Sequence, residues 1–366
     1  MNKLNSMIAV ALFAIIFTSC KKNTDEPIIV VPPSDGSTLT LNGLIGAEAG
    51  SAAGNSVYVD FSKDKQTSVA RTSWDLGFYS GADFRVILNN TTSAGAKVIT
   101  KANASLATVG EADTLGLTLA VSQASPLPAH FAFFDAIDAN LSNTVIPAIS
   151  ATATENKVII LNRGTGGGSA VKSWIKLKVT RNTSGGYTLQ YGKIKETANF
   201  TTIDIPKDGN FNFKFVSLNN GAVVSVEPEK ANWDLVWTYS VYKTTFGSDL
   251  VPYNFSDLVF INKLAGVTAT AVATSTKSYA TFGEADLSVV TFSSARDVIG
   301  SNWRLTQPVT VNGITTPIGV KSDTFFLVKD GSGNVYKLKF NSFISNDGGT
   351  RGKPVIEYKL VKKGSI

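Results

Sequence analysis

The chain has 366 residues, and its 34 Lys and Arg against 28 Asp and Glu give a formal net charge of +6. The positive residues are scattered along the chain, which argues against a nucleic-acid-binding surface. A single cysteine excludes a disulfide framework within the chain, and with a single histidine it excludes a zinc site built from His and Cys ligands.

Residues 1–19 have the composition of an export signal. Lys3 supplies the positive start, and the apolar run that follows is too short to span a bilayer as a helix, which needs about 20 residues. Small residues directly before Cys20 resemble the lipobox of bacterial lipoproteins, although Phe17 stands where leucine is commonest. We therefore expect a lipid anchor on Cys20 in the outer membrane, exposed at the cell surface, and then a tether, residues 20–40, rich in proline and small polar residues.

The tripeptide Trp-Asp-Leu occurs twice, at residues 74–76 and 233–235. The spacing of about 160 residues is one domain length. A run of alternating apolar residues precedes each copy, and an apolar run, a glycine turn and a Lys-Leu-Lys strand follow it. These matches predict a tandem duplication with domains at residues 41–205 and 206–366, each long enough to bury a core.

Apolar and polar residues alternate with period two wherever a pattern is legible, as in residues 174–179 and 336–340. This period is typical of half-buried antiparallel strands. Glycine-containing turn signals separate the strands, and Asn220-Gly221 is the best hairpin candidate. No long segment has a helical period, although short helical turns are expected near residues 129–140 and 283–286. The predicted fold class is all-β, with two similar antiparallel units in tandem.

The order of these features resembles the HmuY family, which comprises haem-binding lipoproteins of Bacteroidetes with an all-β fold. The late motif of that family is a strand, a glycine turn and a Tyr-x-Lys-Leu-x-Phe strand. Residues 325–340 match it best, and residues 158–194 match it more loosely. The resemblance implies haem capture at the cell surface and transfer to an outer-membrane transporter. Known haem binders of the family are single units, whereas this chain is doubled.

The resemblance also implies that two histidine or methionine side chains hold the haem iron. The chain departs from this pattern, because His130 is its one histidine and its two methionines, Met1 and Met7, belong to the export signal. His130 lies in the stretch where the family places its ligands and is the candidate haem ligand, with a tyrosine as the second. The alternative is that His130 is a loop or core-edge residue. Haem is the first candidate cofactor, and neither another cofactor nor a protein metal site is indicated.

Several aromatic residues near the second Trp-Asp-Leu copy form a second candidate. Trp233, Trp237, Tyr239 and Tyr242 are spaced so that a strand with one irregularity turns them to one face. Such a face stacks on a porphyrin or a sugar ring, so Trp237, Tyr239 and Tyr242 are the candidate pocket aromatics. The alternative is that they are core residues.

Enzymatic activity is not indicated by the sequence. There is no Gly-x-Ser-x-Gly nucleophile motif, and the glycine-rich residues 164–169 lack the ending of a phosphate loop. The aspartates available for the carboxylate pair of a glycoside hydrolase are Asp75, Asp83, Asp135, Asp138 and Asp234. Asp75 and Asp234 lie in the repeated tripeptide, which favours a structural role in binding turn amides. Both Trp-Asp-Leu copies are therefore interpreted as framework.

The leading hypothesis is a non-enzymatic surface lipoprotein that binds haem or a related porphyrin for iron acquisition and transfers it to a TonB-dependent outer-membrane transporter. One alternative is a structural or adhesion lipoprotein that kept the fold and lost the ligand. The other is a glycan-binding lipoprotein of a polysaccharide-uptake system, which requires Trp and Tyr side chains exposed to solvent.

Overall fold

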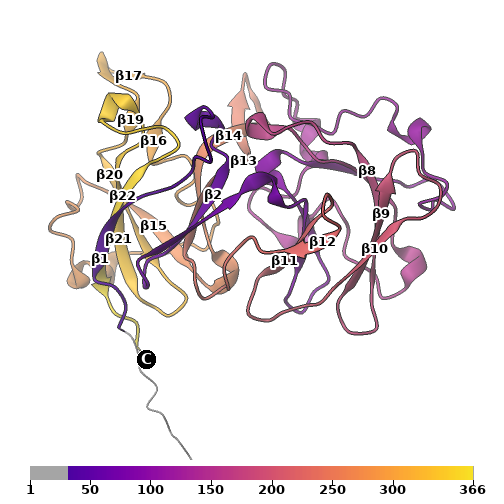
Figure 1. Cartoon of the computed structure of the whole chain (residues 1–366). Helices are drawn as coiled ribbons and strands as arrows, with labels where there is room; N and C mark the ends of the chain where they lie inside the picture. Colours follow the sequence, from indigo (N-terminus) through magenta and orange to yellow (C-terminus); the bar gives the residue numbers. More distant parts are fainter. Residues whose placement is uncertain (1–31, 366) are drawn as a thin grey trace, which may run out of the picture. The chain divides into compact units, whose positions relative to one another are not determined.

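The alternating segments form antiparallel strands throughout residues 32–365, the part of the chain that this computed structural model describes (Figure 1). The predicted export signal, Cys20 and residues 20–31 of the predicted tether lie outside the described residues. From Pro33 onward the chain forms one compact unit. Within the described residues, no helix is long and apolar enough to cross a membrane.

Four main sheets carry the fold. Sheet A has the order β1 (Gly36–Thr40), β22 (Val355–Lys362), β21 (Val335–Ser342), β20 (Thr324–Lys329) and β15 (Thr268–Ala273). Sheet B has the order β14 (Asp249–Ile261), β13 (Leu235–Phe246), β2 (Asn55–Asp60) and β3 (Lys65–Ala70). Sheet C has the order β12 (Ala222–Val224), β11 (Phe213–Ser217), β4 (Leu76–Tyr79) and β5 (Val86–Leu88). Sheet D has the order β10 (Thr201–Ile205), β9 (Tyr187–Lys193), β8 (Ile175–Arg181), β7 (Ile159–Asn162) and β6 (Gly95–Val98).

Smaller elements connect the sheets. Two short ribbons pair β16 (Arg304–Leu305) with β19 (Gly319–Val320), and β17 (Val309–Val311) with β18 (Ile314–Thr316). The helical segments of the described residues are short 3-10 turns: η1 (Gly50–Ala52), η2 (Arg71–Ser73), η3 (Asn90–Thr92), η4 (Glu111–Thr114), η5 (Pro128–Phe133), η6 (Leu141–Asn143), η7 (Ala153–Glu155), η8 (Gly166–Gly168), η9 (Lys263–Ala265), η10 (Glu284–Val289) and η11 (Ser345–Asp347). Turns at η5 and η10 lie where helical turns were predicted.

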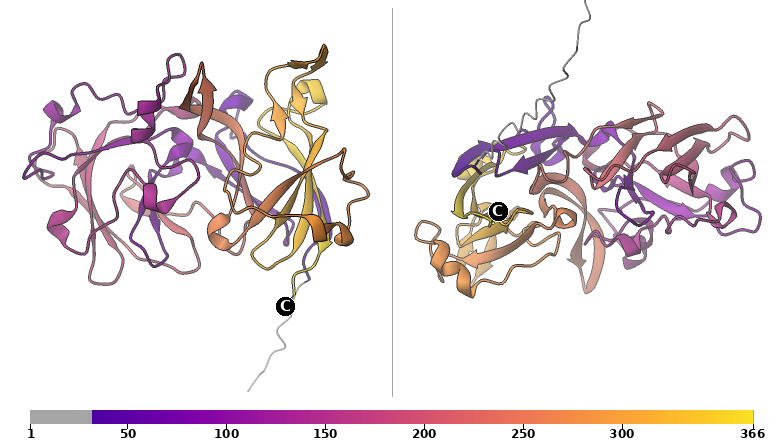
Figure 2. Two further views of the ribbon diagram at one scale, coloured as in Figure 1. Left: turned by 180° about the vertical axis from the view of Figure 1, so that it is seen from behind. Right: turned by 90° about the horizontal axis from the view of Figure 1, so that it is seen from below.

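The four sheets pack as two β-sandwiches, and one sheet of each sandwich faces the other sandwich. Sheets A and B enclose one apolar core, and sheets C and D enclose another. The outer faces of sheets B and C are turned toward each other, so that the order is A, B, C, D, which the views of Figures 1 and 2 both show. Successive side chains of a strand point to opposite faces of its sheet. Sheets B and C can therefore contribute one set of side chains to a sandwich core and the other set to the contact between the two sandwiches.

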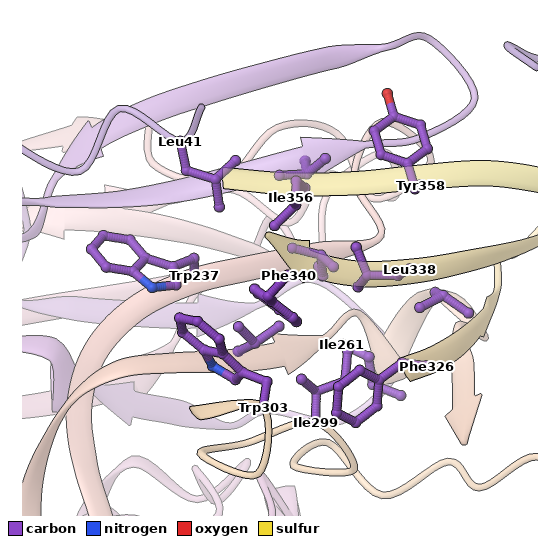
Figure 3. Packing of buried hydrophobic residues seen from close by; sticks show 14 of the residues in the cluster. Leu41, Trp237, Ile261, Ile299, Trp303, Phe326, Leu338, Phe340, Ile356 and Tyr358 are labelled. Carbon is purple, nitrogen blue, oxygen red and sulfur yellow. The ribbon is translucent and has the colours of Figure 1, made fainter. Parts of the chain in front are cut away.

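Strand β13 illustrates the alternation. Leu235 and Trp237 point into the A/B core, whereas Val236 and Tyr242 belong to a cluster on the other face of sheet B. Figure 3 shows Trp237 in the A/B core among Leu41, Trp303 and Phe340, which is why its side chain is only 1% exposed.

The pairing of the strands crosses the boundary predicted between residues 205 and 206. Strand β2, which precedes the first Trp-Asp-Leu copy, pairs with β13 of the second copy. Strand β11, which precedes the second copy, pairs with β4 of the first. As a result, sheets C and D are built from residues 76–224, and sheets A and B combine residues 36–70 with residues 235–362.

The two tripeptide copies make the same backbone contacts. Asp75 Oδ2 accepts the N–H of Leu218 at 2.8 Å, and Asp234 Oδ2 accepts the N–H of Phe61 at 2.7 Å. Leu218 directly follows β11 and Phe61 directly follows β2, the two strands that pair across the predicted domain boundary. An asparagine side chain also donates to the carbonyl of each tryptophan: Asn89 to Trp74 at 2.8 Å, and Asn262 to Trp233 at 3.0 Å. The tandem duplication itself stays a prediction, as do its domain limits.

Arg71 fixes the junction between sheets B and C. Its guanidinium is buried and donates to the carbonyls of Ala53 at 2.8 Å, Gly166 at 3.3 Å and Gly167 at 3.2 Å, as well as to that of Thr91. Gly167 has a φ of +64°, and a Cβ at this position would lie 2.3 Å from the guanidinium. A glycine is therefore needed where the η8 loop meets Arg71.

Candidate ligand cavity

A cavity of about 130 Å³ lies between the facing surfaces of sheets B and C. Side chains of β2, β5, β11 and β13 line it, together with the loop that follows Asp135 and with Glu227 and Arg296. These segments lie far apart in the sequence. The exchanged strands β2 and β11 bring them together, because each places one face of its sheet toward the cavity.

Both repeated tryptophans contribute to the wall of this cavity. Trp74 meets Phe215 edge-to-face with ring centroids 4.8 Å apart, and Trp233 meets Tyr58 in the same way at 5.1 Å. Sequence reasoning interpreted both tripeptides as framework. The aspartates have that role, whereas the tryptophans also form the aromatic walls of the cavity. The repeat alone did not indicate that the two copies would meet at one place.

Glu227 is the most unusual polar group of the cavity. Its side chain is 8% exposed, and Oε1 accepts the N–H of Phe213 at 2.8 Å. Burial raises the pKa of Glu227 to about 8, and the backbone donors only partly oppose this shift. The carboxyl is therefore mostly protonated at neutral pH, so that it can donate a hydrogen bond and adds little negative charge to the cavity.

Asp135 and Arg296 supply the other ionisable groups. Asp135 accepts the N–H groups of Leu88 at 2.6 Å and of Val145 at 2.9 Å, while burial raises its pKa to about 6. The guanidinium of Arg296 lies 4.0 Å from the ring centroid of Phe260, and burial lowers its pKa. Among the described residues, no carboxylate lies within 4.0 Å of this guanidinium.

Two further polar atoms of cavity-lining residues have no hydrogen-bond partner in the described structure. They are the indole Nε1 of Trp233, a donor, and Oδ1 of Asn90, an acceptor. Both atoms are buried. A buried polar group without a partner costs about 1–3 kcal/mol, so both atoms are local costs to the fold at the edge of the cavity.

His130 is not among the residues that line the cavity. It lies in η5, is half-buried, and stacks on Phe133 with ring centroids 5.7 Å apart. Its Nδ1 accepts the N–H of Leu127 at 3.4 Å. A histidine that binds iron through Nε2 normally donates from Nδ1, so this contact favours the opposite tautomer.

The three candidate pocket aromatics do not line the cavity either, and they do not share one face. Trp237 lies in the A/B core, and Tyr242 lies on the other face of β13, where its hydroxyl donates to Asp297 at 2.9 Å. Tyr239 stacks under the guanidinium of Arg71, 4.8 Å from its ring centroid. The register of β13 with β14 shifts between Thr238 and Ser240. Side chains along β13 still alternate between its two faces, so Trp237 and Tyr242 lie on opposite faces.

A haem held by two axial side chains does not fit the described residues. They contain one histidine and no methionine, and the cavity is smaller than the 300–1,000 Å³ typical of ligand pockets, being only about 130 Å³. Nor do the described residues bring three or more His, Cys, Asp or Glu side chains into a metal-binding group. The cavity matches a much smaller ligand.

Comparison with known proteins identifies the family. The family model described as HmuY protein matches residues 52–358, which is most of the chain. No curated protein and no solved structure matches. The family is associated with haem binding at the cell surface rather than with catalysis. The match begins within η1 and ends within β22, and so it covers sheets B, C and D, the cavity between B and C, and sheet A apart from β1 and the end of β22. The chain belongs to the HmuY family.

Proposed function

We propose that this chain is a non-enzymatic binding protein of the cell surface, anchored through Cys20, which takes up a small ligand in the cavity between sheets B and C. The observation that carries the proposal is the wall of that cavity. Trp74 and Trp233 converge there from the two Trp-Asp-Leu copies, next to the buried carboxyl of Glu227. Aromatic walls with a few convergent polar groups are typical of small-molecule sites.

A cavity-filling substitution tests this location. Ala136 lines the cavity, so Ala136→Phe should occupy part of it and abolish binding of single-ring probes such as phenol and benzyl alcohol, measured by tryptophan fluorescence. Ala285→Phe is the matched control, because Ala285 is exposed in η10. Equal binding by wild type and Ala136→Phe, or no binding of any single-ring probe to the wild type, would contradict the proposal.

Haem or a related porphyrin is the ligand expected from the family, and iron acquisition would be its purpose. We propose that this chain does not hold haem iron through paired axial ligands, since His130 is the one histidine of the chain and the cavity is too small. Titration with haem should leave the Soret band without the sharp low-spin form of a six-coordinate site. A sharp band that His130→Ala removes would restore His130 as a ligand and overturn this view.

Delivery of the ligand to a TonB-dependent outer-membrane transporter is part of the same proposal. The adhesion alternative predicts no small ligand at all, which the probe titrations above address. The glycan alternative has less support, because the side chains of Trp237 and Tyr242 are only 1% and 8% exposed and Tyr239 is half-buried under the guanidinium of Arg71.

A further inference from the structure

We infer that the cavity between sheets B and C selects a single-ring carboxylate, a planar ring with one anionic group that pairs with Arg296. This inference rests on the proposed function and specifies the chemistry of the ligand. Three features of the cavity carry it: the free donors of Arg296, the charge of its surroundings, and the shape of its aromatic wall.

The guanidinium of Arg296 retains donors for a ligand. Its one hydrogen bond within the described structure is a long contact of 3.5 Å from Nη1 to the carbonyl of Ile137. Its Cζ lies 4.0 Å from the centroid of the Phe260 ring, so the ring covers one side of the guanidinium and N–H groups remain for a partner. A carboxylate is the group whose geometry matches that edge, because it accepts two parallel N–H bonds.

The acids around Arg296 are already engaged with other groups. Both carboxyl oxygens of Asp135 accept backbone N–H groups, and Asp138 accepts the N–H of Asn140 at 3.0 Å. Asp297 accepts the hydroxyl of Tyr242 and lies 3.3 Å from Lys243 Nζ. The phenol of Tyr58 also lies near Arg296, and burial raises its pKa, so that it stays neutral.

The protonation of Glu227 lowers the negative charge that an anionic ligand meets in the wall of the cavity. An ionised glutamate in the wall would repel a carboxylate, but burial raises the pKa of Glu227 to about 8. At pH 7 the wall therefore presents the Arg296 cation, the Asp135 carboxylate, whose two oxygens each accept a backbone N–H, and a mostly neutral Glu227, which can donate its own hydrogen bond.

The size and walls of the cavity define the body of the ligand. A cavity of about 150 Å³ lined by apolar side chains binds benzene, and the present cavity is close to that size. Trp74 and Trp233 offer ring faces and edges for an aromatic body.

The test compares 4-hydroxybenzoate with 4-hydroxybenzamide, a neutral molecule of nearly the same shape, by tryptophan fluorescence and calorimetric titration of the mature chain at pH 7. The carboxylate should bind about ten- to a hundredfold more tightly, the gain expected from a charge-assisted bond. Arg296→Gln should remove this preference while binding of the amide persists, and Arg296→Lys should retain part of it.

Arg181→Gln is the matched control, since Arg181 also lies over a phenylalanine ring, that of Phe84 at 4.1 Å, but does not line the cavity. It should leave the preference unchanged. Equal affinity of the two probes for the wild type would overturn this inference and leave the cavity proposal intact, and the comparison needs no variant to fold. A preference that survives in Arg296→Gln would also overturn it. Binding of neither probe would overturn the inference, and it would overturn the proposed function as well if the neutral single-ring probes also fail to bind.

Discussion

Replacing Glu227 by glutamine measures how the protonation of one buried carboxyl in the wall of the cavity affects the stability of the fold. Glutamine has nearly the same shape, and its carbonyl oxygen can still accept the N–H of Phe213 that lies 2.8 Å from the glutamate. What changes is the titration, because burial raises the pKa of Glu227 from 4.5 to about 8 and an amide does not titrate.

The sign of the pH dependence follows from this shift. A folded pKa above the unfolded value means that the native state holds one more proton between the two values. The stability that Glu227 contributes is fully present below about pH 4.5 and is lost as the pH rises through about 8. At about 1.4 kcal/mol for each pH unit, the total is on the order of 5 kcal/mol.

Urea denaturation of wild type and Glu227→Gln at pH 5, 6, 7 and 8 measures the effect. The difference between the two unfolding free energies should change by about 1.4 kcal/mol per pH unit, with the variant gaining relative to the wild type as the pH rises. Glu284→Gln is the control, because that side chain is 61% exposed and solvent screens its charge. Parallel curves for wild type and Glu227→Gln would refute the reasoning.

The remaining predictions concern stability at pH 6 in urea. Asp75→Asn should cost about 3–5 kcal/mol, because it leaves the buried guanidinium of Arg163, 2.7 Å away, without its carboxylate. Asp234→Asn should cost only about 1 kcal/mol, because burial raises the pKa of Asp234 to about 8 and its carboxyl is already neutral; equal costs for the two variants would contradict this. Arg71→Gln should cost about 3–5 kcal/mol by removing the donor from several buried carbonyls, and an unchanged midpoint would exclude that role. Trp237→Ala should lower the free energy of unfolding by about 3–5 kcal/mol, because it leaves a cavity in the A/B core. A loss near zero would mean that the indole is exposed in solution.

The sequence was sufficient for the strands and several of their turns. The runs predicted as strands became β2, β7, β8, β11, β20 and β21, and Asn220-Gly221 closes the hairpin between β11 and β12. These features are local: a period of two fixes which side chains share a face, and glycine supplies the positive φ that a tight turn needs. The all-β fold class and the family followed from the same local patterns and are confirmed.

The residues of the candidate site could not be predicted from local sequence patterns as the strands could. Glu227 and Glu229 stand two positions apart in one loop, yet Glu227 is buried in the cavity and Glu229 is exposed. No local signal separates them, because their burial depends on what packs above the loop. His130, Trp237 and Tyr242 drew attention through their residue types, and the fold places none of them in the wall of the cavity.

The sequence by itself determined that this is an all-β chain of the HmuY family with two related Trp-Asp-Leu segments. Only the tertiary structure decided that β2 pairs with β13 and β11 with β4, which turns the tryptophans of both segments toward one cavity. The physical reason is that backbone N–H and C=O groups are the same in every strand. The pattern of side chains therefore predicts that a strand forms, while its partner is selected by packing between residues far apart in the chain.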